Sequence, residues 1–287
     1  MTKIKIVVLA KQVPDTRNVG KDAMKADGTV NRAVLPAIFN PEDLNALEQA
    51  LRIKDEHKDV EITILTMGPS RAAEIIRESL YRGADGGVLL TDRKFAGSDT
   101  LATSYALSLA VKKLNPDLII AGRQAIDGDT AQVGPQVAEK LGFAQITYAE
   151  EVKLEGNEVI VKRRLDRGVE TAKAALPILV TVGSAAPACR PRNAFLTLKY
   201  KHALTNTELQ EADSDYFIKQ KPWLKIQEWG VNDIDAEEAQ LGLSGSPTKV
   251  KKIENVVFTA KESLKLADNE NDIDQLMKEL IDNHTIG

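Results

Sequence analysis

Apolar residues recur along the first two-thirds of the chain in two alternating patterns, short β-branched runs and longer stretches with helical spacing. The short runs predict buried strands at 4–10, 60–67, 87–91, 117–122 and 175–183. The longer stretches predict helices at 40–57, 69–84, 98–115 and 130–142. Strands and helices that alternate at this spacing indicate βαβ units, so we expect a doubly wound, mostly parallel α/β sheet.

Two parts of the chain depart from this alternation. The stretch "QITYAEEVKLEGNEVIVKRRL" alternates around "EGNE" and predicts a β-hairpin inserted into the sheet domain. The residues after 204 form a polar arm with isolated aromatic side chains, namely Tyr216, Phe217, Trp223 and Trp229. Either this arm packs on its own domain, or its aromatic residues anchor it to another surface. The arm ends in an amphipathic helix whose apolar face holds Ile273, Leu276, Met277, Leu280 and Ile281.

Composition narrows the class of protein. The chain has 287 residues, 43% of them hydrophobic and 28% charged, which is typical of a soluble globular protein. No apolar run approaches the roughly 18 residues of a membrane span, and the apolar start predicts a strand rather than a signal peptide. We therefore expect a cytoplasmic location. The lone cysteine, Cys189, excludes a disulfide framework and a multi-cysteine metal centre.

Charge is distributed unevenly along the chain. The net charge of −4 divides into +4 for residues 1–204 and −8 for the remainder. An acidic arm on a mildly basic body indicates contact with a surface of opposite sign. This charge distribution argues against nucleic acid as a partner, because binding to nucleic acid requires a clustered basic face.

The polar residues that could bind a ligand follow the predicted strands. In an open parallel sheet, ligands bind beyond the carboxyl ends of the strands, which here lead into loops 10–16, 66–70, 91–100 and 122–134. In the last loop, Gly128 allows close backbone approach, and we expect a helix to open at Thr130 with free N–H groups that favour phosphate. The alternative is that Asp127 and Asp129 form only a turn and a helix cap.

Common catalytic and nucleotide-binding signatures are absent from the sequence. Neither G-x-G-x-x-G nor a Walker loop follows the first strand. The histidines, His57, His202 and His284, all lie outside the four loops, so we expect neither a hydrolytic triad nor a metal site. A nucleotide hydrolase or adenylating enzyme would require a glycine–serine phosphate loop, which "KQVPDT" does not supply.

Five collinear stretches between residues 4 and 192 resemble the beta subunit of electron-transfer flavoproteins. They are "VVLAKQVPDT", "NPEDLNALEQALRIKDE", "TMGPSRAAEIIRESLYRGAD", "AGRQAIDGDTAQVGPQVAEKLG" and "VKRRLDRGVETAKAALPILVTVGSAAPACRPR". The last resembles the family signature through Arg163, Asp166, Gly168, Glu170 and Pro177. Arg167 and Ala172 depart from the residue types that are usual there.

The resemblance implies an adenine-nucleotide-binding domain at 1–190, a partner-docking region at 191–204, and an arm at 205–287 that contacts an alpha subunit carrying its own FAD. The implied nucleotide-binding positions are Ala10, Asn40, Pro41, Glu42, Asp43, Met67, Ala125, Gly128, Asp129, Thr130, Ala131, Gln132 and Val133. In housekeeping members of the family the ligand is AMP. In electron-bifurcating members it is a second FAD, which is reduced by NADH.

The amino-acid sequences of two loops resemble those of the electron-bifurcating members of the family more than those of the housekeeping members. "KQVPDT" resembles its first loop, and "FAGSDTLATSYAL" resembles its third, where Asp99, Thr100 and Thr103 would line an extended dinucleotide. The alternative for Asp99 is that it only caps the helix that follows. We expect Lys11 and Arg123 to stabilise anionic phosphate or reduced flavin, and no side chain to act as an acid or base.

The resemblance also implies a docking contact after the sheet domain. Leu196 in "PRNAFLTLKYKH" matches the position that anchors an acyl-CoA-type or other flavin dehydrogenase. The run of basic residues usual after it is reduced here to Lys199 and Lys201, which leaves the identity of the dehydrogenase open.

Overall fold

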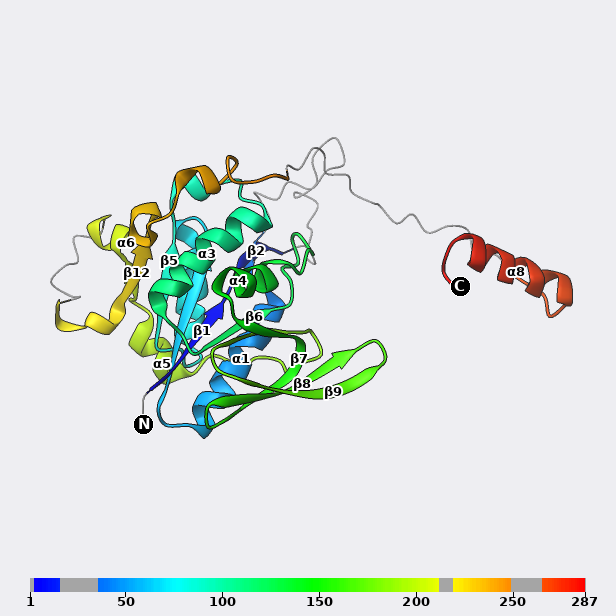
Figure 1. The fold of residues 1–287 in the computed structure, drawn as a ribbon, viewed down its shortest axis with the longest axis horizontal. Helices are drawn as coiled ribbons and strands as arrows, with labels where there is room; N and C mark the ends of the chain where they lie inside the picture. Colours follow the sequence, from blue (N-terminus) through cyan, green and yellow to red (C-terminus); the bar gives the residue numbers. More distant parts are fainter. Residues whose placement is uncertain (1–2, 16–35, 212–218, 249–264, 287) are drawn as a thin grey trace. The chain divides into compact units, whose positions relative to one another are not determined.

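The computed structural model describes residues 3–15, 36–211, 219–248 and 265–286. The chain divides into two compact units, Met1–Lys252 and Ile253–Gly287, which are described separately. Figure 1 shows the ribbon with its elements labelled.

A parallel sheet forms the centre of the first unit. Its core strands are β1 (Ile4–Leu9), β4 (Val60–Met67), β5 (Gly86–Leu90), β6 (Leu118–Gly122) and β10 (Ile178–Val182). Within the described residues the sheet is 10-stranded, in the order β11-β12-β5-β4-β1-β6-β10-β7-β8-β9. The strands from β11 to β7 are parallel, and β8 and β9 continue the sheet antiparallel. The predicted doubly wound α/β fold is therefore confirmed.

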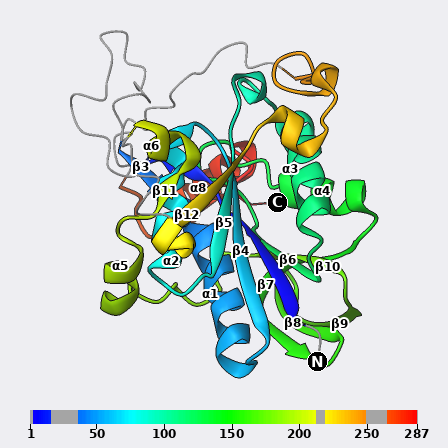
Figure 2. The same cartoon turned by 90° about the vertical axis from the view of Figure 1, so that its left-hand side faces the viewer.

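Helices cover both faces of the sheet (Figure 2). The first face packs against α1 (Pro41–Glu56) and α2 (Ala73–Leu80), and the second against α3 (Thr100–Leu114) and α4 (Val133–Leu141). Strand β1 supplies alternate side chains to the two cores, with Ile6 in the first and Val7 in the second. Burial on both faces explains why the strands read as continuous apolar runs in the sequence.

The order of the strands determines where a ligand can bind. From β1 the chain crosses to β4 and β5 on one side, and later returns to place β6 and β10 on the other, so that β1 pairs with both β4 and β6. The loops that leave β1 and β6 therefore turn to opposite faces of the sheet. This divergence opens a crevice at the carboxyl ends of β1 and β6.

The predicted hairpin is present, and the structure adds a third strand to it. Strands β7 (Ala144–Glu155) and β8 (Glu158–Leu165) form it, and a third strand, β9 (Gly168–Ala175), pairs with β8. Strand β9 was not predicted from the sequence, because this edge strand is largely exposed and lacks a buried apolar run. Since β7 also pairs with β10, the hairpin extends the main sheet.

Part of the chain after residue 204 packs on the sheet domain itself. Strand β12 (Lys225–Trp229) runs parallel to β5, and Ile226 and Leu241 are buried in the two cores. Trp229 is half-buried beneath Lys113 Nζ, which lies 4.5 Å from the ring centre, whereas Trp223 is 47% exposed. Tyr216 and Phe217 lie outside the described residues.

Short elements complete the first unit. Strands β2 (Gln12–Pro14) and β3 (Ala37–Phe39) form a separate antiparallel ladder, and β11 (Leu204–Thr205) pairs with β12. Two further α-helices in the described part of this unit are α5 (Ala194–Tyr200) and α6 (Asn206–Glu211). Short 3-10 helices are η2 (Ser70–Ala72), η3 (Arg93–Phe95), η4 (Pro222–Leu224), η5 (Val231–Ile234) and η6 (Glu238–Gln240).

The second unit contains the amphipathic helix predicted near the end of the chain. Helix α8 (Glu270–Asp282) begins after Asn269, whose side chain accepts a hydrogen bond from the N–H of Asp272. Its apolar stripe, which includes Ile273, Leu276, Met277 and Ile281, is exposed within this chain. None of the helices in the described ranges combines the length and the apolar character that crossing a membrane requires.

Candidate functional site

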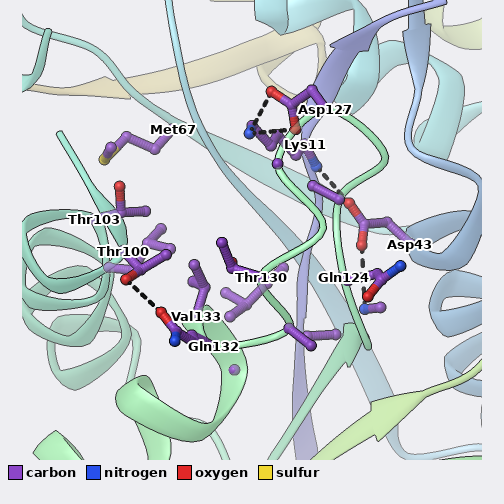
Figure 3. Close-up of a pocket in the computed structure, with 18 of the residues that line it drawn as sticks. Lys11, Asp43, Met67, Thr100, Thr103, Gln124, Asp127, Thr130, Gln132 and Val133 are labelled. Carbon is purple, nitrogen blue, oxygen red and sulfur yellow. Dashed lines mark hydrogen bonds and ion pairs between the residues drawn. The ribbon is translucent and has the colours of Figure 1, made fainter. Parts of the chain in front are cut away.

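A cavity of ≈ 370 Å³ lies at the carboxyl ends of the central strands, at the crevice set by the strand order (Figure 3). This volume is near the lower end of the range for small-molecule sites. Its apolar lining comes from strand ends and helix faces, namely Leu9, Leu65, Met67, Phe95, Leu107, Ala121 and Val133. Its polar lining comes from the loops, so the cavity suits a ligand with one apolar part and one polar part.

The structure brings almost all of the predicted site residues to this cavity. Lining it are Ala10, Lys11, Asp43, Met67, Asp99, Thr100, Thr103, Arg123, Ala125, Gly128, Asp129, Thr130, Ala131, Gln132 and Val133. Each of the four predicted loops contributes at least one of them. Asn40, Pro41 and Glu42 do not line the cavity. The role of these residues in binding a nucleotide remains a prediction.

Asn40 holds the loop after β6 in place. Its amide nitrogen donates to the carbonyl of Gln124 at 2.9 Å, and its amide oxygen accepts from the N–H of Ile126 at 3.2 Å. The side chain is fully buried and makes no helix-capping hydrogen bond. Asparagine is a common helix N-cap residue, but the side chain of Asn40 does not cap α1, because its amide binds the neighbouring loop.

The two carboxylates in the first turn of α1 hold both loops of the crevice. Asp43 accepts hydrogen bonds from the N–H of Lys11 at 2.8 Å and from the N–H of Gly122 at 3.2 Å. Glu42 accepts from the N–H of Gln124 at 2.9 Å. A Cβ on Gly122 would lie 2.3 Å from Asp43 Oδ1, so only glycine allows this approach. The start of α1 thereby fixes the ends of β1 and β6 relative to each other.

The buried position of Asp43 changes the pKa of its carboxyl group. Burial raises its pKa to about 7, although hydrogen bonds from the side chain of Asn40 and from the N–H groups of Lys11 and Gly122 act in the opposite direction. Burial is the larger effect because the group is almost completely removed from water.

The N-terminal ends of α3 and α4 meet on the opposite side of the cavity. Figure 3 shows Thr100, Thr103 and Met67 on this side, facing Lys11, Asp43 and Asp127. Thr100 donates its hydroxyl proton to the side-chain oxygen of Gln132 at 2.9 Å. Asp99 caps α3 by accepting the N–H groups of Leu101 and Ala102, both at 3.0 Å, and it also lines the cavity, so a contact with a ligand stays a prediction beside its capping role.

The loop before α4 differs from its prediction. The helix begins at Val133, so the expectation of a start at Thr130 is wrong. Asp129 and Ala131 have positive φ values of 50° and 52°, and this backbone cannot continue a helix. Alanine is strained in this region, and such strain concentrates at functional sites.

The irregular loop leaves a run of backbone donors at the cavity. Among the described residues, none accepts a hydrogen bond from the N–H groups of Thr130, Ala131, Gln132 or Val133. All four residues line the cavity, and the last of them opens α4. Consecutive N–H groups at a helix N-terminus form a site for an anion. A Cβ on Gly128 would meet no protein atom within 4 Å, so the approach to these donors is open there.

The cationic side chains at the cavity already have anionic partners. Lys11 Nζ lies 2.8 Å from both carboxylate oxygens of Asp127. An Arg123 Nη lies 3.4 Å from Glu42, and its guanidinium group lies over the ring of Tyr148. The lining also contains more aspartates than cations. A phosphate group would therefore depend mainly on the N–H donors of residues 130–133.

Sequence reasoning missed a set of lining residues that complete the cavity. They are Leu9, Leu65, Phe95, Gly97, Ser98, Leu107, Ala121, Gly122, Gln124, Asp127 and Gly134. The strand-end members could have been found from the rule that ligands lie beyond strand ends. For Asp127 a turn is the alternative that the sequence offers, and the structure shows that its side chain pairs with Lys11 across the crevice. In the described part of the chain, no group of three or more His, Cys, Asp or Glu side chains could hold a metal ion.

The region predicted to dock a partner lies on α5, away from the cavity lining. Leu196 is half-buried and packs against the core, whereas Phe195 and Leu198 are 74% and 67% exposed. The segment before α5 is fixed by Arg190, whose guanidinium lies 2.9 Å from Glu48 and 2.7 Å from Asp55. A rigidly held short helix therefore presents Phe195 and Leu198 to solvent.

Comparison with known proteins identifies relatives over nearly the whole chain. The profile of the electron transfer flavoprotein domain matches residues 27–200. An electron transfer flavoprotein subunit beta from Megasphaera elsdenii is 44% identical over 97% of this chain and 98% of that protein.

Two further relatives have names that include an enzyme complex. The acryloyl-CoA reductase electron transfer subunit gamma of Anaerotignum propionicum is 44% identical over 87% of each chain. Subunit CarD of the caffeyl-CoA reductase–Etf complex of Acetobacterium woodii is 50% identical over 62% of this chain and 68% of that protein.

The raised pKa of Asp43 predicts a specific pH dependence of stability. Between the ordinary carboxyl pKa of ~3.9 and the value of about 7, the folded chain retains a proton that the unfolded chain has lost. Asp43 therefore contributes less stability as the pH rises through this window, by at most ~1.4 kcal/mol per pH unit. The variant Asp43→Asn lacks this titration.

Denaturant unfolding of the purified full-length chain from about pH 5 to 8 measures this effect. We expect the stability of the wild type relative to Asp43→Asn to fall up to about pH 7 and then to level off. If the variant does not fold, NMR titration of the Asp43 carboxyl carbon in the wild type gives the pKa directly. Parallel stability curves, or a carboxyl that titrates near 4, would contradict the assignment.

Proposed function

Because the chain belongs to the electron transfer flavoprotein family, as a beta subunit, we propose that its cavity holds FAD at an interface with an alpha subunit that carries a second FAD. In this proposal NADH supplies the electrons. They pass on to the FAD of the alpha subunit and to a partner dehydrogenase, which is the pattern of electron bifurcation. Housekeeping electron transfer with AMP in the cavity is the alternative.

One observation supports nucleotide binding above the others, namely the run of N–H donors at residues 130–133. These donors lie beside an apolar lining that includes Leu9, Leu65 and Met67. An adenine nucleotide has the matching parts, a flat ring system and an anionic phosphate. The chain's own groups therefore fit the proposed ligand.

The third loop supports FAD over AMP. Gly97, Ser98, Thr100 and Thr103 extend the lining beyond the N–H donors, which gives a longer ligand further polar contacts. A cavity of ≈ 370 Å³ needs further walls to enclose a whole dinucleotide, and in this proposal the alpha subunit supplies them. The relatives named as parts of acryloyl-CoA reductase and of a caffeyl-CoA reductase–Etf complex are further support.

In this proposal the residues of the chain position the ligand. When bound, FAD supplies the redox chemistry, accepting a hydride from NADH. The N–H groups of 130–133 fix the phosphates, the strand ends exclude water from the ring, and the first turn of α1 holds the two loops in register. No lining side chain needs to transfer a proton.

A nucleotide hydrolase of similar fold is not supported by the loop after β1. Such an enzyme would use free N–H groups there to hold phosphate. In this chain the N–H of Ala10 donates to Leu65, and the N–H of Lys11 donates to Asp43. The donors that a phosphate loop would need are therefore already occupied.

Cofactor analysis of the purified complex with its alpha subunit tests this proposal. Flavin is quantified by absorbance and AMP by chromatography after denaturation. We expect one FAD for each of the two chains, no AMP, and bleaching of both flavins by NADH. One flavin and one AMP per heterodimer would select the AMP alternative, and a beta subunit without any nucleotide would contradict both.

For the docking region, we propose that α5 contacts an acyl-CoA-type or other flavin dehydrogenase. The resemblance assigns the anchor to Leu196, but this side chain is half-buried and packs on the core. The exposed Phe195 and Leu198 are better placed to enter a partner's surface. Lys199 and Lys201, also exposed, would border the contact with positive charge.

Alanine variants of α5 distinguish the two anchors. The assay measures electron exchange between the complex and an acyl-CoA dehydrogenase that reacts with the wild-type complex. The KM of this reaction for the dehydrogenase should rise about 10-fold in the Phe195→Ala complex, since an exposed aromatic anchor contributes more than 1 kcal/mol to binding. The cofactor content of the Phe195→Ala complex should be unchanged. Leu196→Ala should chiefly lower thermal stability. The exposed Trp223 provides the control variant, Trp223→Ala. The reverse order of effects on KM would return the anchoring role to Leu196.

A further inference from the structure

One wall of the cavity is supported, on the side away from the cavity, by a segment that comes much later in the chain. Residues 238–248 run against residues 94–99, of which Phe95, Gly97, Ser98 and Asp99 line the cavity. Leu241 is 2% exposed and belongs to the same buried cluster as Phe95. Lys94 forms an ion pair with Glu238. None of the residues 238–248 lines the cavity itself.

The backbones of the two segments approach closely at two glycines. Gly242 has a φ of 53°, and a Cβ there would lie 2.4 Å from the carbonyl oxygen of Lys94. A Cβ on Gly97 would lie 2.7 Å from the side chain of Leu243. The segment is therefore fitted closely against the loop.

Two hydroxyl groups of this segment bind Asp99. Ser246, which is 5% exposed, accepts the N–H of Asp99 at 2.8 Å and donates its proton to the carbonyl of Gly242 at 2.6 Å. Thr248 donates its hydroxyl proton to Asp99 Oδ2 at 2.7 Å and its backbone N–H to the same oxygen at 3.1 Å. We call Ser246, Thr248 and Asp99 together the clasp.

The clasp fixes Asp99 completely. One carboxylate oxygen takes the N–H groups of Leu101 and Ala102, and the other takes both donors of Thr248. Burial alone would raise the pKa of Asp99, but the hydrogen bonds from Thr248 and the helix outweigh it and hold the pKa below its usual range. Asp99 therefore has no oxygen left for a ligand, and its role at the cavity is to orient the first turn of α3.

We propose that Ser246 and Thr248 are positioning residues for the nucleotide in the cavity. They hold Asp99, and through it the residues of α3 that line the wall, Thr100 and Thr103. Neither Ser246 nor Thr248 touches the ligand. The inference rests on the proposed function, because it assumes that this wall contacts a nucleotide.

The size of the expected effect follows from the bonds involved. Hydrogen bonds to charged groups are among the stronger ones in proteins, but only the part of this interaction that orders the cavity wall contributes to nucleotide affinity. Loss of the Thr248 hydroxyl should therefore raise the Kd for the nucleotide by about 3- to 10-fold. The backbone N–H of Thr248 still binds Asp99 in a Thr248→Val variant, so the fold should be retained.

The test compares Thr248→Val with Thr248→Ser in the complex with the alpha subunit. The first variant keeps the shape of the side chain and removes the hydroxyl, whereas the second keeps the hydroxyl. Equilibrium dialysis with FAD and with AMP gives the Kd, and calorimetry gives the Tm. Ser246→Ala and the exposed Thr171→Val serve as a second clasp variant and as a matched control.

We expect weaker nucleotide binding in Thr248→Val and Ser246→Ala, near-normal binding in Thr248→Ser and Thr171→Val, and little change in Tm for either threonine variant at 248. Unchanged Kd in Thr248→Val, or equal weakening in Thr248→Ser, would overturn the positioning role while the proposed function stands. If the wild-type complex binds neither FAD nor AMP, the proposed function fails and the clasp inference fails with it.

Discussion

The anchoring of two loops by the first turn of α1 is the interaction on which the site depends. Asn40, Glu42 and Asp43 bind main-chain groups of the segments that leave β1 and β6, which turn to opposite faces of the sheet. Without these bonds, buried N–H groups at the crevice would lack partners, which costs about 1–3 kcal/mol each. The order of the strands creates the crevice, and the start of α1 fixes its width.

In this arrangement, different polar groups stabilise the cavity and bind the ligand, two roles that the same polar residues often share. The side chains at the cavity mostly satisfy one another, since Lys11 pairs with Asp127 and Arg123 pairs with Glu42. The main-chain N–H groups at 130–133 have no acceptor among the described residues and are available to a ligand. Backbone donors lose no side-chain rotamer freedom on binding, so they suit a site whose purpose is to hold a cofactor in one position.

The sequence predicts well the elements whose side chains are buried on a regular period. The core strands β1, β4, β5, β6 and β10 and the helix α1 fall within a few residues of their predicted positions, because each must fill a core on a fixed face. The four ligand loops follow from the positions of those strands. The edge strand β9 and the inner strand β12 were missed because most of their side chains are exposed or half-buried, which removes the apolar signal.

Local geometry that depends on distant partners could not be predicted from the sequence. Nothing in "DGDTAQVG" indicates that Asp129 and Ala131 take positive φ and delay α4 until Val133. Asn40 has the residue type of a cap, yet a loop some 84 residues away takes its amide. The contact of Thr248 with Asp99, across 149 residues, likewise has no local signature.

The most direct measurement is a crystal structure of the complex with its alpha subunit, grown with FAD and separately with AMP. The account predicts phosphate oxygens within hydrogen-bonding distance of the N–H groups of Thr130 to Val133, with Asp43 still bound to the N–H groups of Lys11 and Gly122. A nucleotide held instead by Lys11 and Arg123, with the N–H groups of 130–133 turned away from it, would contradict the account.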